Sequence, residues 1–423
     1  MRFFAAALLL MRILMTTSVY PRFPGDATPP FVQHLAGALA AQGWDVMVLA
    51  PHGPGARFCE EVTLDNAKAG GRLRIRRFPY AWPFGLQKLC YEGGMLVNLK
   101  TRPWTRLLLP FLIGMQLGAT LWLILRYRPV LVHSHSLLPQ GFTARWATTL
   151  LRRPHVTTSH GNDVFGLRPD GLMGKLKRDV LKKACAVTVN SRATRAAVVE
   201  LGCSAEKIHL IPAMPGSSTR SPEVMDKIRA EVIGTRRPVL TFVGRLIEDK
   251  GVGDLLVAVA ELRPTWPELV VLIVGDGQDR ARFVQQAADL KLGEAVHWAG
   301  WVPSEHVVSW MAVADAVVVP SRENPGGWKE AQGLVVVEAM QAGRPVVATR
   351  TGGIPDMVVE AGTGFLVPER DPSALAAALD RLFRDPASAQ AMGQAGQARA
   401  AEQFSPEAVT RQTEDLYRAM MKP

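Results

Sequence analysis

One stretch, residues 316–343, constrains the fold more than any other part of the chain. It begins with a short apolar run, Ala316 to Val319, that has the character of a buried strand. A polar loop rich in Gly and Pro follows, and Leu334 to Ala342 then has the pattern of a short helix ending at Gly343, where a left-handed residue is favoured. Free backbone N–H groups and the positive end of the helix dipole meet at such a junction, which therefore predicts a phosphate-binding site.

Two carboxylates, Glu330 and Glu338, bracket this junction with seven residues between them. If the whole interval were helical, the pair would lie about 12 Å apart along the axis. That is further than the ~5 to 10 Å that separates the carboxylates of a glycoside hydrolase. The spacing suits contacts to two hydroxyl-bearing groups at opposite ends of a long ligand, with phosphates between. The alternative is that Glu330 is a solvated loop charge and Glu338 an ordinary residue of a helix surface.

The rest of the chain repeats the strand–loop–helix pattern. Arg12 to Thr17 is a short apolar strand, a helix with Pro29 near its start follows, and Asp45 to Ala50 is the next strand. Such alternation predicts doubly wound sheets of the α/β class. With 423 residues the chain is too long for one hydrophobic core, so two domains are expected. The first loop lacks a G-x-G-x-x-G motif, which argues against a nicotinamide dehydrogenase.

A second loop of this kind carries two basic residues. The strand Pro238 to Val243 is followed by Gly244 and Arg245, then by Lys250, before a helix begins at Val252. An arginine offers a fixed fork of donors and a lysine a point charge, so both side chains can bind one diphosphate from this loop.

A histidine stands at a similar place in the first half of the chain. His160 lies within Ser159 to Asp163, just beyond the C-terminal end of a predicted strand, where open α/β sheets bind ligands. Asp163 is a weaker candidate because aspartate also caps helices well. His133 and His135 lie at the end of another predicted strand, and packing or capping is the expected role for both.

Three motifs together resemble the family 4 nucleotide-sugar glycosyltransferases. They are E-x7-E at Glu330 and Glu338, followed by Glu-Ala-Met-x-Ala-Gly-x-Pro-Val-Val-Ala; Gly-Arg-x4-Lys-Gly from Gly244; and His-Gly-x-Asp from His160. The resemblance covers nearly the whole chain and is strongest from residue 237 to 368. It implies the GT-B fold, with two Rossmann-like domains of doubly wound parallel sheet facing a cleft. Residues 1–215 would form the acceptor domain, 216–404 the donor domain, and 405–423 a helix crossing back to the first domain.

The resemblance also implies an activity, the retaining transfer of a hexose from a UDP- or GDP-sugar to an acceptor hydroxyl. Glu330 and His160 would meet the donor sugar, Glu338 the ribose, and Arg245 with Lys250 the leaving diphosphate. No Asp-x-Asp motif stands in a loop, so neither a metal nor another cofactor is expected. The remaining residues implied to bind the donor are Gly25, Asp163, Gly244, Gly275, Gly333, Leu334 and Val335.

The chain departs from the family pattern at two places. Gly25 stands in Pro24-Gly25-Asp26 where the family has Gly-Gly, and the plain-turn interpretation of Gly25 stays open. The family's Ile-Pro-Asn-Gly-Val-Asp is replaced after Ile211 and Pro212 by Ala-Met-Pro-Gly. Two alternatives therefore remain: an epimerase of the same fold that acts on a nucleotide sugar, and a non-catalytic subunit that binds one.

Charge is unevenly divided along the chain. The first 220 residues carry 28 Lys and Arg against 11 Asp and Glu, a net charge of +17, and the remainder carries −6. This predicts an anionic partner, either a membrane surface or a diphosphate-linked lipid acceptor; a generally basic, Arg-rich proteome would explain the excess equally well. No nucleic-acid motif is present, so nucleic acid is not an expected partner. The expectation is a cytoplasmic enzyme, peripheral at the inner face of the membrane, that extends a lipid-linked or cell-surface polysaccharide precursor.

Two apolar segments bear on the membrane. Leu107 to Leu125 is almost all apolar and about as long as a membrane span needs to be, but Pro, Gly and Gln interrupt it, and a buried or membrane-facing helix is expected. Met1 to Leu10 resembles a signal peptide without a polar cleavage region, and translation is expected to start at Met11. The four cysteines lack metal-site spacing and are expected to be buried thiols in a reducing compartment.

Overall fold

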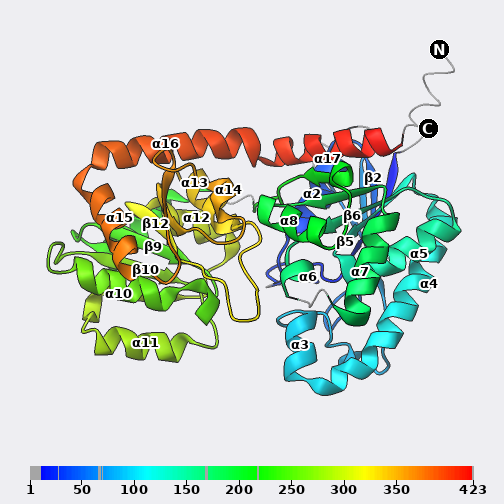
Figure 1. Cartoon of the computed structure of the whole chain (residues 1–423), viewed down its shortest axis with the longest axis horizontal. Helices are drawn as coiled ribbons and strands as arrows, with labels where there is room; N and C mark the ends of the chain where they lie inside the picture. Colours follow the sequence, from blue (N-terminus) through cyan, green and yellow to red (C-terminus); the bar gives the residue numbers. More distant parts are fainter. Residues whose placement is uncertain are drawn as a thin grey trace, which may run out of the picture. The chain divides into compact units, whose positions relative to one another are not determined.

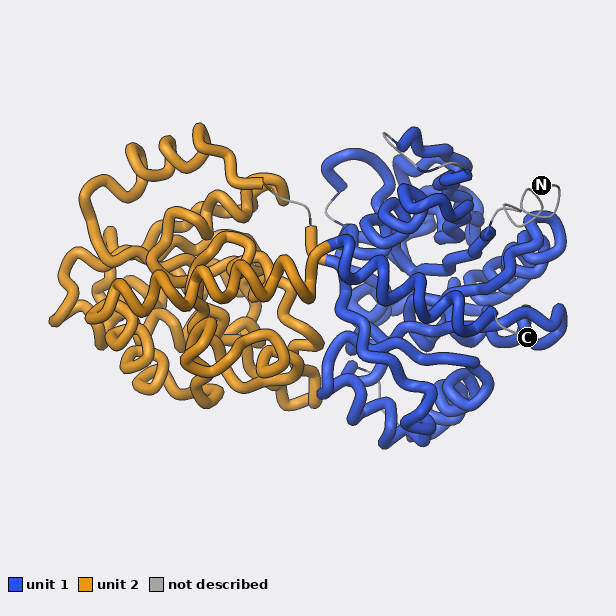
Figure 2. The backbone as a smooth tube through the Cα atoms, turned by 90° about the horizontal axis from the view of Figure 1, so that it is seen from above, with its two compact units in different colours: residues 1–214, 406–423 blue, residues 215–405 orange. Residues whose placement is uncertain are grey.

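The structure, a computed structural model, describes residues 11–421 except 27, 65–67, 69, 167–169 and 217–218. The predicted start at Met11 concerns residues 1–10, which lie outside this description. The chain forms two compact units, coloured in Figure 2. Unit 1 combines residues 1–214 with 406–423, and unit 2 is formed by residues 215–405. The borders predicted from the sequence, after residues 215 and 404, lie one residue from these.

Unit 1 is built on an eight-stranded sheet with the order β3-β4-β2-β1-β5-β6-β7-β8 (Figure 1). All its neighbouring strands pair in parallel except β3, which pairs antiparallel with β4. The expectation of a parallel sheet is therefore wrong at this edge. The strands are β1 (Arg12–Thr17), β2 (Asp45–Pro51), β3 (Cys59–Val62), β4 (Arg72–Phe78), β5 (Leu131–His135), β6 (His155–Ser159), β7 (Ala186–Val189) and β8 (Ile208–Leu210).

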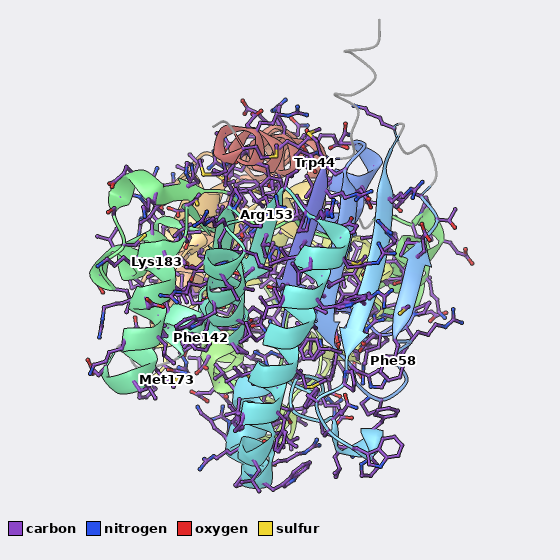
Figure 3. All side chains as sticks on the ribbon, turned by 90° about the vertical axis from the view of Figure 1, so that its right-hand side faces the viewer. Trp44, Phe58, Phe142, Arg153, Met173 and Lys183 are labelled. Atoms are coloured by element: carbon purple, nitrogen blue, oxygen red, sulfur yellow. The ribbon has the colours of Figure 1, made fainter. Side chains whose placement is uncertain are left out.

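Helices cover the sheet of unit 1, and its apolar strand residues are buried between them. The last helix of the chain belongs to this unit. Its Tyr417 ring lies edge-on to Trp44, with ring centroids 5.6 Å apart, and Trp44 Nε1 donates to Glu414 Oε1 at 2.5 Å. Figure 3 labels Trp44 beside this last helix. The predicted return of the C-terminal helix to the first domain is thus confirmed. The main helices are α2 (Phe31–Ala41), α3 (Met95–Thr101), η2 (Pro103–Leu108), α4 (Leu109–Tyr127), α5 (Phe142–Leu150), α6 (Asn162–Phe165), α7 (Gly171–Lys183), α8 (Arg192–Glu200) and α17 (Pro406–Met420).

Unit 2 has a six-stranded sheet with the order β11-β10-β9-β12-β13-β14, parallel throughout. Apart from β11 at the edge of the sheet, whose residues are mostly half-buried, its strands are short apolar runs with almost no exposure, as expected when helices cover both faces of a parallel sheet. The strands are β9 (Val239–Val243), β10 (Val270–Val274), β11 (Val296–Gly300), β12 (Ala316–Val319), β13 (Val346–Thr349) and β14 (Gly364–Val367). The main helices are α9 (Pro222–Ile228), α10 (Val252–Leu262), α11 (Arg280–Asp289), α12 (Ser304–Ala312), α13 (Leu334–Gln341), α14 (Ile354–Met357), α15 (Pro372–Arg384) and α16 (Pro386–Gln403).

Register decides where the loops of unit 2 meet. Val274 of β10 pairs with Val243 of β9, and Val317 of β12 pairs with Thr241, so the strands end at one edge of the sheet. The loops predicted to bind the donor follow these strands, and we call them the donor loops. This edge is where open α/β sheets bind ligands.

Candidate functional site

Backbone contacts hold the loops of unit 2 together at the carboxyl edge of the sheet. Gly244 N donates to Val274 O at 3.0 Å, and Arg322 N, after β12, donates to Asp249 O at 2.9 Å. Gly275 has φ +132, and a Cβ there would lie 2.0 Å from Gly244 O. Only glycine fits that approach, which explains this predicted glycine as a packing requirement between the loops after β9 and β10.

Lys250 and Glu330 form an ion pair across these loops, although they lie 80 residues apart in the sequence. Their side chains keep only 18% and 15% of their exposure. Lys250 Nζ also lies 5.6 Å from the centroid of the Trp328 ring, within the range of a cation–π contact. Glu330 O accepts from Gly353 N at 2.8 Å, which fixes the backbone of the Glu330 loop. Lys250 and Glu330, which were predicted from separate sequence motifs, are therefore in direct contact at the carboxyl edge of the sheet.

Arg245 is different from Lys250 because it has no carboxylate partner. It is exposed on the loop after β9, and no hydrogen bond or ion pair of its guanidinium occurs in the described part of the chain. Its five donors are available to an anion from solution.

The start of helix α13 brings further donors to this edge. Gly333 precedes the helix in the left-handed conformation, with φ +83, and Leu334 and Val335 open it. The first N–H groups of a helix have no partner inside it, and they lie at the positive end of its dipole. The predicted strand–loop–helix junction is therefore present, and phosphate binding at it stays a prediction.

Glu338 lies one turn into α13 and is half-buried. Burial raises the pKa of its carboxyl from 4.5 to about 7. Among the described residues no side-chain or backbone donor bonds to this carboxylate. Cations, free amides and two carboxylates thus share the carboxyl edge of one sheet, an arrangement that can hold a diphosphate and the hydroxyls on either side of it.

Unit 1 offers a different kind of site, a cluster of histidines at the carboxyl ends of β5 and β6. His135 Nδ1 and His160 Nε2 are 3.2 Å apart, and the two rings are stacked with centroids 5.4 Å apart. His133 lies beneath them, 2.6 Å from both the Tyr417 hydroxyl and Thr158 Oγ1. A cavity of about 30 Å³, enough for a water molecule, borders all three rings.

Burial keeps these histidines neutral. It lowers the pKa of His133 from 6.5 to about 3 and that of His160 to about 4, while the pKa of His135 falls well below 6.5. Nearby imidazoles lower the pKa values of His133 and His135 further. A neutral imidazole can donate one hydrogen bond and accept another, so the cluster suits hydroxyl groups rather than an anion.

The position of His135 in this cluster was not predicted from the sequence. Only a role in packing or helix capping was expected for it. His135 pairs with Thr158 of β6 in the sheet, so its side chain reaches the edge beside His160. The available signal was that His135 ends one predicted strand and His160 follows another. The sequence alone does not show that these two strands are adjacent in the sheet. Tyr417 could not be found either, because its contact with His133 spans 284 residues.

Two family models match this chain on either side of the unit border. One, described as Glycosyl transferase 4-like domain, matches residues 28–213, and the other, Glycosyl transferases group 1, matches residues 224–399. A D-inositol 3-phosphate glycosyltransferase of Corynebacterium urealyticum is 31% identical over 316 residues, covering 69% of this chain and 71% of the relative. The chain belongs to the family 4 glycosyltransferases.

Other matches to this glycosyltransferase extend over nearly its full length. A glycogen synthase of Mycobacterium tuberculosis is 29% identical over 422 residues, 97% of this chain and 95% of the relative. The crystal structure of Anabaena Alr3699/HepE in complex with UDP superposes with a TM-score of 0.71 at 20% identity, covering 97% of this chain and all of the other. The GT-B fold predicted from the motifs is therefore confirmed, and the chain is an enzyme that transfers glycosyl groups.

Two predicted donor-binding residues of the glycosyltransferase have other visible roles. Asp163 is buried, and its oxygens accept from Leu137 N and Ser159 Oγ, both at 2.8 Å. These bonds tie the ends of β5 and β6 together, so the contacts of Asp163 position the loop of His160. Gly25 sits in a tight turn with φ +79, and no heavy atom lies within 4 Å of where a Cβ would be. This conformation agrees with a plain turn glycine. It also leaves the Gly25 backbone accessible to a ligand, so both interpretations of Gly25 stay open.

The described residues contain no group of three or more His, Cys, Asp or Glu side chains arranged to hold a metal ion. All four cysteines are free thiols, and Cys90 and Cys203 are buried as predicted. The prediction is wrong for Cys59 and Cys185, which are exposed.

Proposed function

We propose that this glycosyltransferase transfers a hexose from a UDP- or GDP-sugar to an acceptor hydroxyl with retention of the anomeric configuration. The observation that carries the proposal is the convergence of Arg245, Lys250, Glu330 and the start of α13 on one edge of unit 2. The UDP bound by the Anabaena neighbour supports a nucleotide-sugar donor.

The reaction accumulates negative charge on the leaving diphosphate, and this is where catalysis by unit 2 would act. Arg245 would bind the diphosphate with its free guanidinium, and Lys250 would add a point charge held in place by Glu330. The free amides of Leu334 and Val335 would complete the set. Preorganised donors of this kind stabilise developing charge without a reorganisation cost, and removing one typically costs about 100- to 1,000-fold in rate.

The carboxylates would recognise hydroxyls at both ends of the donor. Glu330 would accept hydrogen bonds from the sugar hydroxyls, and Glu338 from the ribose. Ribose hydroxyls would supply the donors that Glu338 lacks. In unit 1, His160 would contact the sugar through its neutral imidazole, backed by His135. The cationic side chains take the place that a metal has in other transferases, so we propose that transfer needs no metal.

A direct test substitutes Glu330 by Gln, which keeps the size of the side chain and removes its charge. We expect transfer from the best of a panel of UDP- and GDP-sugars to fall by about 100-fold or more while the melting temperature stays within a few degrees. The Glu323→Gln variant, changed on the same loop, should keep its activity. Full turnover by Glu330→Gln would refute the proposal, and NMR of the product's anomeric proton tests retention.

The acceptor is proposed to be lipid-linked, and one surface of unit 1 supports this. Residues 103–127, covering η2 and α4, are long enough to cross a membrane. Their most apolar 18-residue window has a mean hydropathy of 1.9, yet only 28% of that window is buried. In Figure 3, α4 runs across the side of unit 1 that faces the viewer. Each of the following side chains is at least 43% exposed: Trp104, Leu107, Phe111, Met115, Trp122 and Leu125.

These six residues recur at helical spacing on one side, and we call them the α4 apolar face. The opposite side of α4, including Leu112 and Leu123, packs into unit 1, so the helix is built into the fold on one face. Arg76 stacks over the Trp122 ring at 5.0 Å, and Arg106 and Arg126 are exposed on the same segment. An apolar face bordered by basic residues fits the interface of an anionic bilayer better than a span. We therefore propose that unit 1 docks peripherally on the inner face of the membrane.

A further inference from the structure

Unit 2 contains a cavity of about 630 Å³ away from the donor loops. Pro238, Asp315 and Pro345 line it, and they directly precede β9, β12 and β13. Because these strands are parallel, their first residues form the edge opposite to the one where the donor loops meet. Residues of α15 and α16 form the remaining wall. The volume is in the range of small-molecule sites.

Three arginines line this cavity: Arg220, Arg237 and Arg344. Arg220 Nη2 donates to Gln341 O at 3.2 Å, and it would lie 3.0 Å from a Cβ placed on Gly343. Arg344 is half-buried and donates to Ala312 O. The guanidiniums thus come from three different segments of the chain and surround one space.

None of the three arginines forms an ion pair with a carboxylate in the described part of the chain. Burial lowers the pKa of Arg344, the nearby Asp315 carboxylate raises it, and the cations Arg220, Arg229 and Arg237 lower it further. The charges of these residues therefore interact across the cavity. Asp315 is the acidic residue in the lining, and its Oδ2 already accepts from Val239 N at 2.7 Å. The cavity is therefore strongly positive, although the chain from residue 221 onward carries a net charge of −6.

The other lining residues suit a sugar. Three glutamines, Gln390, Gln394 and Gln397, repeat at helical spacing on α16, so their amides face the same side. Trp266 and Phe383 add two aromatic rings with centroids 5.6 Å apart. Amides can donate to and accept from hydroxyls, and aromatic rings can pack against the C–H face of a pyranose.

We propose that this cavity binds a phosphorylated sugar, with the phosphate between Arg220, Arg237 and Arg344 and the hydroxyls against the α16 glutamines. Guanidinium–phosphate hydrogen bonds are charge-assisted and often bidentate, so three arginines favour a phosphate dianion strongly. The proposed site is separate from the donor loops, and it does not depend on the proposed transfer reaction.

Isothermal titration calorimetry on the full chain tests the proposed sugar phosphate site. The buffer contains about 150 mM salt, because salt at this concentration screens non-specific ion pairing. The probes are glucose 6-phosphate, inorganic phosphate and glucose. We expect saturable binding of the hexose phosphate, weaker binding of phosphate and none of glucose. Arg220→Gln and Arg237→Gln, both exposed in the free protein, should each weaken hexose phosphate binding about tenfold or more. Their affinity for UDP or GDP should be unchanged.

Arg195→Gln, which removes an exposed arginine on α8 of unit 1, is the matched control and should bind like the wild type. The proposal is overturned if glucose 6-phosphate gives no saturable heat, or if both cavity variants bind it normally. Displacement by a nucleoside diphosphate, one for one, would place the hexose phosphate at the donor loops and equally overturn it. If phosphate binds as tightly as the hexose phosphate, the sugar part of the proposal is wrong.

Discussion

The two units place chemically different side chains at the same edge of similar sheets. Unit 2 presents charges there: Lys250 is paired with Glu330, and Arg245 has no ion-pair partner among the residues that the structure describes. Unit 1 presents His133, His135 and His160, all neutral because they are buried. Since a doubly wound sheet fixes only the location of a site, the chemistry depends on the side chains at the end of each strand and in the loop after it. We therefore propose that unit 2 binds the charged part of the donor and that unit 1 contacts hydroxyl groups.

The largest effect is expected from the charged edge. Lys250→Ala removes a cation next to the proposed diphosphate and leaves Glu330 half-buried without its partner. We expect kcat/KM to fall about 100- to 1,000-fold, with weaker binding of UDP or GDP. Lys227→Ala, at an exposed position of α9, should leave both quantities unchanged. If Lys250→Ala kept full activity, the proposal that the charged residues of unit 2 stabilise the leaving diphosphate would be wrong.

A smaller effect is expected from the histidine cluster. His160→Asn keeps a hydrogen-bonding side chain but shortens it, so contact with the sugar should be lost. We expect kcat/KM to fall about 10- to 100-fold, while the affinity for the bare nucleoside diphosphate stays the same. His306→Asn on α12 of unit 2 serves as the control. If nucleotide affinity fell as much as turnover, the proposed division of labour between the units would be wrong.

The next prediction concerns the α4 apolar face of unit 1, which we propose binds the membrane. The double variant Leu107→Glu, Phe111→Glu places two negative charges on the α4 apolar face. We expect co-sedimentation with vesicles rich in phosphatidylglycerol to fall about tenfold or more, with soluble-acceptor activity retained. Leu172→Glu, an exposed apolar residue on α7, is the matched control. Equal binding to neutral and anionic vesicles would remove the electrostatic part of the proposal.

The smallest effects concern pH, and the two units should respond in opposite directions. His133 and His160 of unit 1 have pKa values lowered from 6.5 to about 3 and about 4. As the pH falls, these histidines therefore take up protons in the unfolded chain before they do so in the folded protein. Their contribution to stability is complete above pH 6.5 and is lost as the pH falls toward 4. Glu338 has a pKa raised from 4.5 to about 7, so its contribution declines as the pH rises from 4.5 to 7.

Thermal unfolding between about pH 4.5 and 8 measures both trends. Glu338→Gln should raise the melting temperature of unit 2 above pH 7 by roughly 2–4 °C, the usual shift for about 1 kcal/mol in a unit of this size. It should have no effect near pH 4.5, where Glu338 is largely protonated in the folded state and close to its ordinary pKa in the unfolded chain. A variant that lowers the melting temperature at about pH 8 would contradict the raised pKa.

Local patterns in the sequence were enough to predict most of the fold and most of the unit 2 site. The run before Pro320 and the stop at Gly343 predicted β12 and α13, and Gly343 does have a positive φ of 62. Local patterns failed where a contact joins distant segments. The Lys250–Glu330 pair crosses 80 residues, and no single loop encodes it.

The strand β3 was missed for a different reason. Its four residues, Cys59 to Val62, are mostly exposed, and the two central ones are glutamates. A short edge strand of this kind lacks the alternation or the apolar run that identifies strands. It forms because β4 offers an antiparallel partner, which is a property of the sheet rather than of the segment.

The return of α17 to unit 1 sets an order of events during synthesis. A ribosome makes the first 214 residues of unit 1, then all of unit 2, and only then the 18 residues that complete unit 1. Until Tyr417 emerges, Trp44 and His133 lack the ring and the hydroxyl that they contact in the finished protein. The earliest part of the chain is therefore the last to close its core, and a nascent chain halted at residue 405 exposes that apolar surface to chaperones and proteases.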